Sequence, residues 1–342
     1  MLFRRRTPRT VNLALQGGGA HGAFTWGVLD ALLEDGRLAF EGISGTSAGA
    51  MNAVVLAHGL LQAGRDGARE ALASFWQAVA ASAPFDLAGV GATNGENANL
   101  APGVKAVLRW ARHFAPHELN PFDVNPLRDI VAAQIDFARL RAASPLKLFI
   151  AATHANTGKL RIFKTPELTA EALLASACLP ALHRAVEIDG EPYWDGGYSA
   201  NPAVFPLIYD CATRDILLVL LSPLLHGETP HSAEAIRDRA LDLAFSATFL
   251  REMRMYAHAR EFAGRTLIPV GRLERRYRRM NFHLVEAEEL MSQLASETKL
   301  ATSLPFLEML RDQGRARAQA WLGASHANVG RRSSVDIAAL FF

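Results

Sequence analysis

The chain has 342 residues, 50% of them hydrophobic, which is enough to bury a sizeable core in one large domain or one domain with a helical extension. A formal net charge of +2 excludes a strong general attraction to nucleic acid, and the two cysteines, Cys178 and Cys211, form neither a disulfide framework nor a metal-ligand pattern. The basic N-terminus lacks the apolar run of a secretory signal, and no stretch of about 18 apolar residues predicts a membrane span. We therefore expect a cytoplasmic protein, either free or peripheral at the membrane, and the sequence indicates no cofactor or metal ion.

Two glycine motifs follow the first two predicted strands. The apolar run 11–15 leads into the sequence GGGAHG at residues 17–22, and the run 40–43 leads into GTSAG at residues 45–49. Each motif opens a segment with helical spacing, so both are predicted as strand-to-helix turns. Such turns lie at the same edge of a parallel sheet.

The second turn matches the G-x-S-x-G nucleophile elbow around Ser47. In that elbow the serine adopts a strained conformation between strand and helix, and the flanking glycines leave room for closely approaching backbone. The helix N-terminus that follows favours a developing negative charge. The alternative is a tight glycine turn with an incidental serine, because short matches of this kind also arise by chance.

The triple glycine of the first turn suits an oxyanion loop, because consecutive glycines allow several backbone N–H groups to converge on one point. The glycines at 17, 19 and 22 also fit the dinucleotide fingerprint G-x-G-x-x-G. That fingerprint expects an acidic residue about 20 positions further on, near the end of the second strand. The second strand instead ends at Ser47, which favours the oxyanion loop.

A base for the serine is predicted at Asp195, which is followed by two glycines. A tight turn at this point presents the carboxylate, and the preceding residues 185–192 resemble a hairpin. The alternative is an ordinary β-turn, because Asp-Gly is one of the commonest turn pairs.

The remaining pattern predicts an α/β fold, a three-layer α/β/α sandwich with a mostly parallel central sheet. Continuous apolar runs at 146–153 and 216–221 are typical of buried parallel strands, and helices are predicted at 68–81, 127–141 and 171–177. Residues 84–103 are predicted as a loop leading to an apolar segment at 104–114. This part of the chain has two interpretations, a lid or acyl-chain channel and plain core packing.

Beyond Pro230 the pattern predicts helices over 233–262 and from about His283 to Trp321. Between them, residues 272–279 form the densest basic stretch of the chain. A cluster of this kind attracts anionic phospholipid head groups by about 1 kcal/mol per basic residue. The alternative, which we favour, is a solvated, partly paired surface.

The motifs GGGAHG, GTSAG and DGG, in this order and with the segment 175–180 between them, resemble the patatin-like phospholipases, which are lipid acyl hydrolases. The resemblance covers about residues 10–222. It implies a catalytic domain over 10–222, with a lid or acyl-channel segment at 84–125, and a mainly helical C-terminal extension over 223–342 packed on the same domain.

The resemblance also implies a catalytic dyad without histidine, with Ser47 as nucleophile and Asp195 as general base. The oxyanion hole it implies is the loop of Gly17, Gly18 and Gly19. The residues that support these motifs are Ala20, His21, Gly22, Gly45, Gly49, Gly196 and Gly197. The substrate implied is a phospholipid or another carboxylic ester, with peripheral contact to a membrane and no nucleic acid partner.

One position departs from the family pattern, because His21 stands where arginine or lysine is common. Histidine is only partly charged near neutral pH, so this position either alters the pH dependence or merely packs at the helix start. Two other functions stay open. A Ser-Asp-His triad would use one of the downstream histidines, which are His226, His231, His258, His283 and His326. A catalytically silent lipid-binding protein of the same fold is the other alternative.

Overall fold

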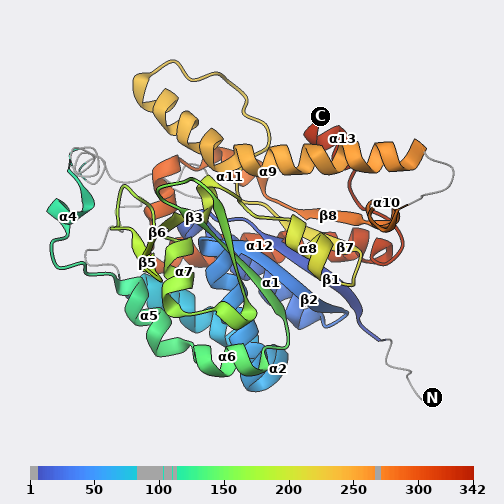
Figure 1. Cartoon of the computed structure of the whole chain (residues 1–342), viewed down its shortest axis with the longest axis horizontal. Coiled ribbons are helices and arrows are strands. Elements are labelled where there is room, and N and C mark those ends of the chain that lie inside the picture. The colour runs from blue at the N-terminus through green and yellow to red at the C-terminus, as the bar shows by residue number, and fades with distance from the viewer. Residues whose placement is uncertain (1–6, 83–102, 104–109, 111–113, 266–270) are drawn as a thin grey trace.

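The computed structural model describes residues 7–82, 103, 110, 114–265 and 271–342 (Figure 1). The strands are β1 (Arg9–Leu15), β2 (Leu38–Thr46), β3 (Lys147–His154), β4 (Leu160–Lys164), β5 (Val186–Ile188), β6 (Glu191–Asp195), β7 (Asp215–Val219) and β8 (Asn281–Val285). The α-helices are α1 (Gly22–Asp35), α2 (Ala48–Ala81), α4 (Pro116–Leu119), α5 (Pro126–Gln134), α6 (Phe137–Ala143), α7 (Ala170–Ser176), α8 (Phe205–Asp210), α9 (Ala233–Arg265), α10 (Arg272–Arg279), α11 (Glu288–Gln293), α12 (Leu304–Ser325) and α13 (Ile337–Phe341). Short 3₁₀ turns are η1 (Gly19–His21), η2 (Thr165–Glu167), η3 (Gly196–Tyr198), η4 (Ser296–Leu300) and η5 (His326–Asn328).

The strands form one mixed, mostly parallel sheet in the order β5-β6-β3-β2-β1-β7-β8, and β4 also pairs with β3. Strands β3, β2, β1, β7 and β8 are mutually parallel, whereas β4 and β6 run antiparallel to β3. Helices cover both faces, with α1 and α2 on one side and α9 and α13 on the other (Figure 1). The predicted α/β/α sandwich is therefore confirmed.

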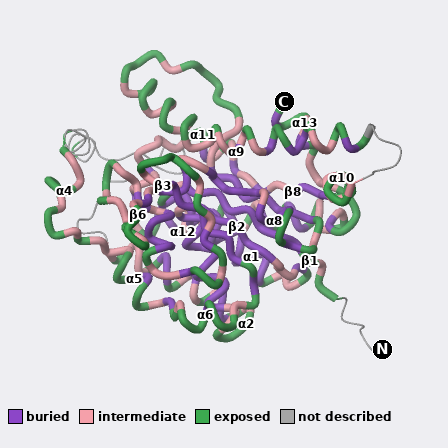
Figure 2. Tube along the Cα trace, in the orientation of Figure 1, coloured by how far each residue is buried: buried purple, intermediate pink, exposed green. Residues whose placement is uncertain are grey.

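The alternation of side chains along β1 shows why its sequence is continuously apolar. Val11, Leu13 and Leu15 belong to the core beneath α1, α2 and α12, whereas Ala14 belongs to the core beneath α8 and α9. Both faces of the strand are therefore buried, as in other sheets covered by helices on both sides. The buried residues follow the sheet through the centre of the molecule (Figure 2).

The strand register brings the three sequence motifs to one edge. Leu15 at the end of β1 pairs with Gly45 of β2, so the turns that follow β1 and β2 are neighbours. Thr46 pairs with Ala151 of β3, and the next residue, Ala152, pairs with Asp195 of β6. Asp195 and the turn at Ser47 are thus two strands apart, and two strand spacings place their backbones about 10 Å from each other across the sheet.

The segment 127–141 differs from the single helix predicted there. It forms two helices, α5 and α6, separated at Ile135 and Asp136. The Asp136 side chain accepts a hydrogen bond from the Arg139 N–H and so caps α6, while the Asp136 N–H donates to His58 Nε2. Aspartate favours this local capping over helix continuation.

The C-terminal part is mainly helical but also adds a strand to the sheet. Residues 281–285 form β8, which pairs with β7, so the prediction of a helix from His283 onward was wrong for its first residues. A five-residue apolar run does not distinguish a buried strand from a helix by periodicity. Among the described helices, none has an apolar stretch long enough to cross a membrane. The predicted lid segment, 84–125, lies largely outside the described residues.

Helices α1 and α12 cross at two glycines, and this contact yields a prediction of stability. A Cβ on Gly314 would collide with the Phe24 carbonyl, and a Cβ on Gly27 would collide with the Arg311 backbone. Gly314→Ala should therefore lower the free energy of unfolding by about 1–3 kcal/mol, because α12 must shift away from α1. Chemical denaturation monitored by circular dichroism measures this change.

Gly323→Ala is the matched control on α12, since no heavy atom lies within 4 Å of a Cβ at that position. Alanine there should be neutral or stabilise the helix by up to about 1 kcal/mol. Equal unfolding midpoints for the two variants would contradict the crossing described here.

Candidate active site

Ser47 is the single residue between β2 and α2. Its backbone has φ 54° and ψ −123°, a conformation that non-glycine residues seldom adopt. It is half-buried, so its side chain remains accessible at the turn. Its N–H donates to Ser176 Oγ at 3.0 Å, and its carbonyl accepts the first hydrogen bond of α2 from Met51. A strained serine that is held by backbone bonds on both sides has the geometry expected of a nucleophile elbow.

The flanking glycines are required by close approach of backbone. A Cβ on Gly45 would lie 2.6 Å from the Gly49 carbonyl oxygen, and a Cβ on Gly49 would collide with the Leu15 carbonyl. The turn therefore packs directly against the end of β1. Gly22 is also closely packed, because a Cβ on it would lie 2.5 Å from the Cβ of Ala48.

Asp195 ends β6 and is fully buried. Its N–H donates to the Cys178 carbonyl and its carbonyl accepts from Thr153 Oγ1, each at 2.8 Å. One carboxylate oxygen, Oδ1, accepts the Gly197 N–H at 2.7 Å. The other oxygen, Oδ2, is buried and has no partner at hydrogen-bond distance among the described residues. A buried carboxylate with one oxygen that lacks a protein donor is able to accept a proton there.

The environment of Asp195 raises its pKa to about 7. Burial is the dominant cause, and the Gly197 N–H and the Ser47 hydroxyl oppose it by stabilising the charged form. The Ser47 hydroxyl makes no hydrogen bond of ordinary length to Asp195 Oδ2. The two side chains therefore interact over a distance longer than a hydrogen bond. A base with a pKa near 7 is half ionised at neutral pH, which suits general base chemistry.

The two glycines after Asp195 also permit close packing. A Cβ on Gly196 would collide with the Ala151 carbonyl, and one on Gly197 would collide with the Phe245 ring of α9. The turn η3 is therefore enclosed between β3 and α9. Thr46 Oγ1 donates to the Ala200 carbonyl at 2.8 Å, which joins this turn to the serine elbow.

The glycine loop after β1 packs against the elbow. A Cβ on Gly17 would lie 2.7 Å from the Cβ of Ser47. The Gly17 N–H donates to Asn201 Oδ1 at 2.7 Å, so it is already occupied in this conformation. The N–H groups of Gly18 and Gly19 have no hydrogen-bond partner in the part of the chain that the structure describes. Of the three N–H groups predicted for the oxyanion loop, those of Gly18 and Gly19 are therefore available to a bound oxyanion in this conformation.

Two residues at the site were missed by the sequence interpretation. Asn201 bonds both backbone groups of Gly17, and Ser176 receives the Ser47 N–H. Ser176 lies in the segment 175–180, whose presence supported the family resemblance without indicating a role. Asn201 follows the DGG motif by four residues and carried no signal of its own.

His21 is buried at the end of η1, where Ala20 is also buried. Burial, reinforced by the charge of Lys299, lowers the pKa of His21 to about 3. The imidazole is therefore neutral near pH 7 and supplies no positive charge. Of the two interpretations of this position, the packing role agrees with the structure.

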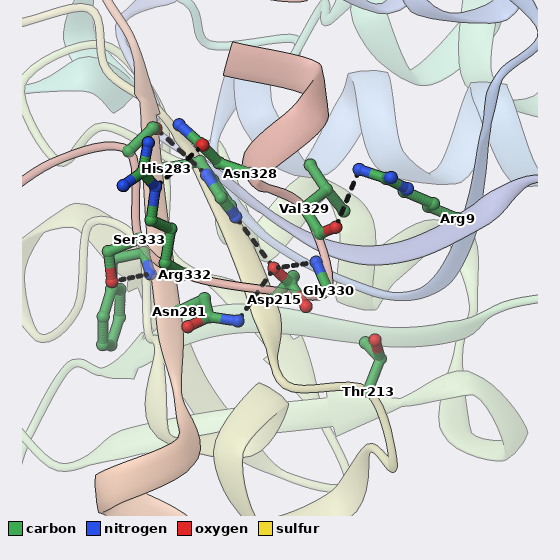
Figure 3. A network of polar contacts seen from close by, with 12 residues as sticks. Arg9, Thr213, Asp215, Asn281, His283, Asn328, Val329, Gly330, Arg332 and Ser333 are labelled. Atoms are coloured by element: carbon green, nitrogen blue, oxygen red, sulfur yellow. Dashed lines mark hydrogen bonds and ion pairs between the residues drawn. The ribbon is translucent and has the colours of Figure 1, made fainter.

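Among the described residues, the downstream histidines are not hydrogen-bonded to the predicted pair of Ser47 and Asp195. His283 is the most deeply buried, and it lies on β8 with Nε2 2.9 Å from Asp215 Oδ1 and Nδ1 3.0 Å from Ser334 Oγ (Figure 3). Figure 3 shows this pair within a network that fastens residues 328–333 to β7 and β8. The network contains a serine, a histidine and an aspartate, but it does not form a triad with Ser47. Asp215 is the first residue of β7 and so lies at the opposite end of the parallel strands from Ser47.

No group of three His, Cys, Asp or Glu side chains among the described residues is arranged as a metal site. The site geometry rests instead on a hydroxyl, a buried carboxylate and free backbone N–H groups. Together these groups are suited to acyl transfer, in which a nucleophile, a base and an oxyanion site are needed.

The model of the patatin-like phospholipase family matches residues 13–208. That match covers more than half of the chain, so the chain belongs to the patatin-like phospholipase family and the predicted resemblance is confirmed. No curated protein matches the chain.

Solved structures of two bacterial proteins are similar to the chain. VipD from Legionella pneumophila is 16% identical over 90% of this chain and 68% of that chain, with a TM-score of 0.37. Full-length ExoU of Pseudomonas aeruginosa, in complex with SpcU, is 17% identical over 91% of this chain and 53% of that chain, with a TM-score of 0.31. The chain therefore spans about half the length of ExoU.

The buried charge of Asp195 predicts a stability change that depends on pH. Because its pKa is higher in the folded protein than in the unfolded chain, the folded state binds more protons between pH 4 and 7 and loses stability as pH rises through that range. Asp195→Asn keeps the acceptor for the Gly197 N–H and removes the charge. It should raise the free energy of unfolding at pH 8 by about 2–4 kcal/mol.

Urea unfolding at pH 8 and at pH 4.5 measures this difference, and the gain should nearly vanish at the lower pH. An Asp195→Asn protein that is less stable than the original at pH 8 would contradict a desolvated carboxylate at this position.

Proposed function

We propose that the chain is a serine lipid acyl hydrolase that cleaves carboxylic esters of phospholipids or related lipids. One observation carries this proposal: the strained Ser47 turn is joined to the turn after Asp195 by the Thr46–Ala200 hydrogen bond, and the buried Asp195 Oδ2 has no hydrogen-bond partner among the described residues. The Ser47 hydroxyl also stabilises the charged form of this carboxylate and so opposes the rise of its pKa. Membership of the patatin-like phospholipase family supports a lipid substrate.

In the proposed reaction Asp195 accepts the proton of Ser47 as the hydroxyl oxygen attacks the ester carbonyl. The negative charge on the carbonyl oxygen is stabilised by the N–H groups of Gly18 and Gly19, while Gly17 is fixed by Asn201. The alcohol then leaves with the proton, and an acyl-enzyme ester remains on Ser47. Asp195 next takes a proton from water as the water oxygen attacks the acyl group. The bond between the acyl carbon and Ser47 Oγ then breaks, Asp195 returns the proton to Ser47 Oγ, and the fatty acid is released.

The dyad is tested by removing each of its side chains. Ser47→Ala and Asp195→Asn should each lower kcat by at least about 1,000-fold on a soluble p-nitrophenyl ester, because the nucleophile or its base is lost. A fluorophosphonate probe should label the original protein once and leave Ser47→Ala unlabelled.

Ser292→Ala is the matched control, since this serine is exposed on α11 and bonds only within its own helix. It should keep full activity and labelling. Hydrolysis by the Ser47→Ala protein at the original rate would overturn the proposed function.

We also propose which surface of the protein meets the lipid. Phe122 and Val124 are 88% and 63% exposed, and Leu182 is 38% exposed. The Arg184 side chain donates to the Pro121 carbonyl at 3.1 Å, so the segments that carry these apolar side chains are in contact.

The segment that carries Leu182 is in turn bonded to Asp195. Cys178 Sγ bonds the Arg184 carbonyl, and the Cys178 carbonyl accepts the N–H of Asp195. Exposed apolar side chains beside the site of a lipid hydrolase are suited to insertion at the lipid–water interface. This apolar patch, defined as Phe122, Val124 and Leu182, is the proposed membrane-contact surface.

The basic helix α10 lies far from the apolar patch and from Ser47. It ends at Arg279, two residues before the first residue of β8, whereas Ser47 follows the last residue of the parallel strand β2. The helix is thus at the opposite edge of the sheet, and Figure 1 shows α10 and α4 at opposite ends of the molecule. Arg276 of this helix bonds the carbonyls of Ile208 and Cys211, so it fastens α10 to the end of α8. These observations favour the solvated-surface interpretation of the basic stretch.

The apolar patch predicts a difference between dissolved and membrane-bound substrate. Phe122→Ser combined with Val124→Ser should lower the hydrolysis of phosphatidylcholine in vesicles by about 10-fold, because the apolar area that enters the interface is lost. Turnover of a soluble short-chain ester should stay within twofold. Vesicle sedimentation and fatty-acid release measure the two effects.

The control is Arg275→Gln combined with Arg279→Gln, which neutralises two exposed charges of α10. It should leave vesicle hydrolysis unchanged. If the control variant loses vesicle activity and the apolar variant retains it, the membrane-contact surface lies on α10 instead.

A further inference from the structure

A segment from the C-terminal part packs directly on the glycine loop. The 3₁₀ turn η4 places the Lys299 carbonyl against Gly19, where any Cβ would collide with it. Gly19 also has φ +58°, a conformation that favours glycine. The family match ends at residue 208, so this contact joins the loop to a part of the chain that the family model does not cover.

Thr298, at the centre of η4, is fully buried and connects this turn to His21. Its hydroxyl donates to the Ala295 carbonyl at 2.6 Å and lies 2.8 Å from His21 Nε2. A hydroxyl has only one proton to donate, and we assign it to the shorter contact, with the Ala295 carbonyl, so that the imidazole donates the bond with Thr298. The neutral ring therefore carries its proton on Nε2.

The orientation of the His21 ring is thus determined by residues outside the family match. Besides the bond to Thr298, the ring packs edge-on against Phe306 of α12, with ring centres 6.3 Å apart. The backbone N–H of His21 donates to the Gly18 carbonyl at 3.2 Å. Fixing His21 therefore also fixes the turn that contains Gly18 and Gly19.

The glycine loop, residues 17–21, is fixed by hydrogen bonds at both ends, whereas the N–H groups at its centre are unpartnered among the described residues. Asn201 holds Gly17 at one end, and Thr298 holds His21 at the other. Between them are the two N–H groups that have no partner among the described residues. A peptide group can stabilise an oxyanion only if its direction is set before the reaction, because reorientation during the reaction costs free energy.

We infer that Thr298 is a positioning residue for the oxyanion hole, which acts through its hydrogen bond with His21 to direct the Gly18 and Gly19 N–H groups toward the reacting carbonyl. The inference rests on the proposed acyl hydrolase function. Thr298 itself does not touch the substrate in this scheme. Its hydroxyl holds the loop, and the segment 295–301 becomes a functional part of the site.

The inference is tested with Thr298→Val, which keeps the shape of the side chain and removes the acceptor for His21. It should lower kcat on a soluble ester by about 10- to 100-fold, since small displacements of aligned groups have effects of this size. KM should change by less than twofold. Thr298→Ser restores the hydroxyl and should restore kcat to within about threefold of the original value.

Active sites are counted by the endpoint of fluorophosphonate labelling, so that kcat is expressed per folded and labelled protein. A merely structural role of Thr298 would lower the labelled fraction and leave kcat per labelled site unchanged. Thr302→Val is the matched control, because the Thr302 hydroxyl has no hydrogen bond to the described residues of the chain. It should retain the original kcat.

His21→Phe tests the same bond from its other side and does not depend on the folding of Thr298→Val. Phenylalanine keeps an aromatic ring against Phe306 and removes the donor to Thr298, so the same loss of kcat is expected. An unchanged kcat per labelled site in Thr298→Val and His21→Phe would overturn the inference. Failure of the proposed function itself is recognised separately, because the original protein would then neither hydrolyse the ester nor label at Ser47.

Discussion

The close approach of backbone segments at the carboxyl edge of β1 and β2 is the constraint on which the rest of the site depends. The turn at Ser47 lies against the end of β1, and the glycine loop lies against the turn, at separations that leave no room for a Cβ. Glycine at these positions allows the serine to adopt its strained conformation beside the loop. The two motifs form one compact structure because the parallel register makes β1 and β2 neighbours.

The second constraint is the burial of Asp195. Folding places its carboxylate in a site without water-exposed surface and provides a single backbone donor for one of its oxygens. This arrangement destabilises the charged form, which is unfavourable for stability and favourable for a base that must take a proton near neutral pH. Such a conflict between stability and chemistry is common at active sites. It distinguishes Asp195 from an aspartate of an ordinary exposed turn.

The C-terminal part is joined by specific contacts to the part of the chain that the family model matches. Strand β8 extends the sheet, α12 crosses α1 at two glycines, and η4 packs on the glycine loop. The buried pair of Asp215 and His283 fastens the segment after α12 to β7 and β8 (Figure 3). These contacts support the expectation that the C-terminal extension, 223–342, packs on the same domain as the part matched by the family model.

The sequence by itself determined the family and the layered α/β fold, and it predicted the roles proposed for the three motifs. These features depend on short-range rules, namely apolar runs that form buried strands and glycines that permit turns, and such rules are readable within a few residues. The same rules misassigned His283 and did not detect the break at Asp136, because a short apolar run and a capping aspartate have more than one local solution. Only the tertiary structure decided that the Gly17 N–H is occupied by Asn201, that His21 is neutral, and that Thr298 reaches it from 277 residues away. The physical reason is that hydrogen-bond partners and desolvation are set by which distant segments meet, and no local pattern encodes those meetings.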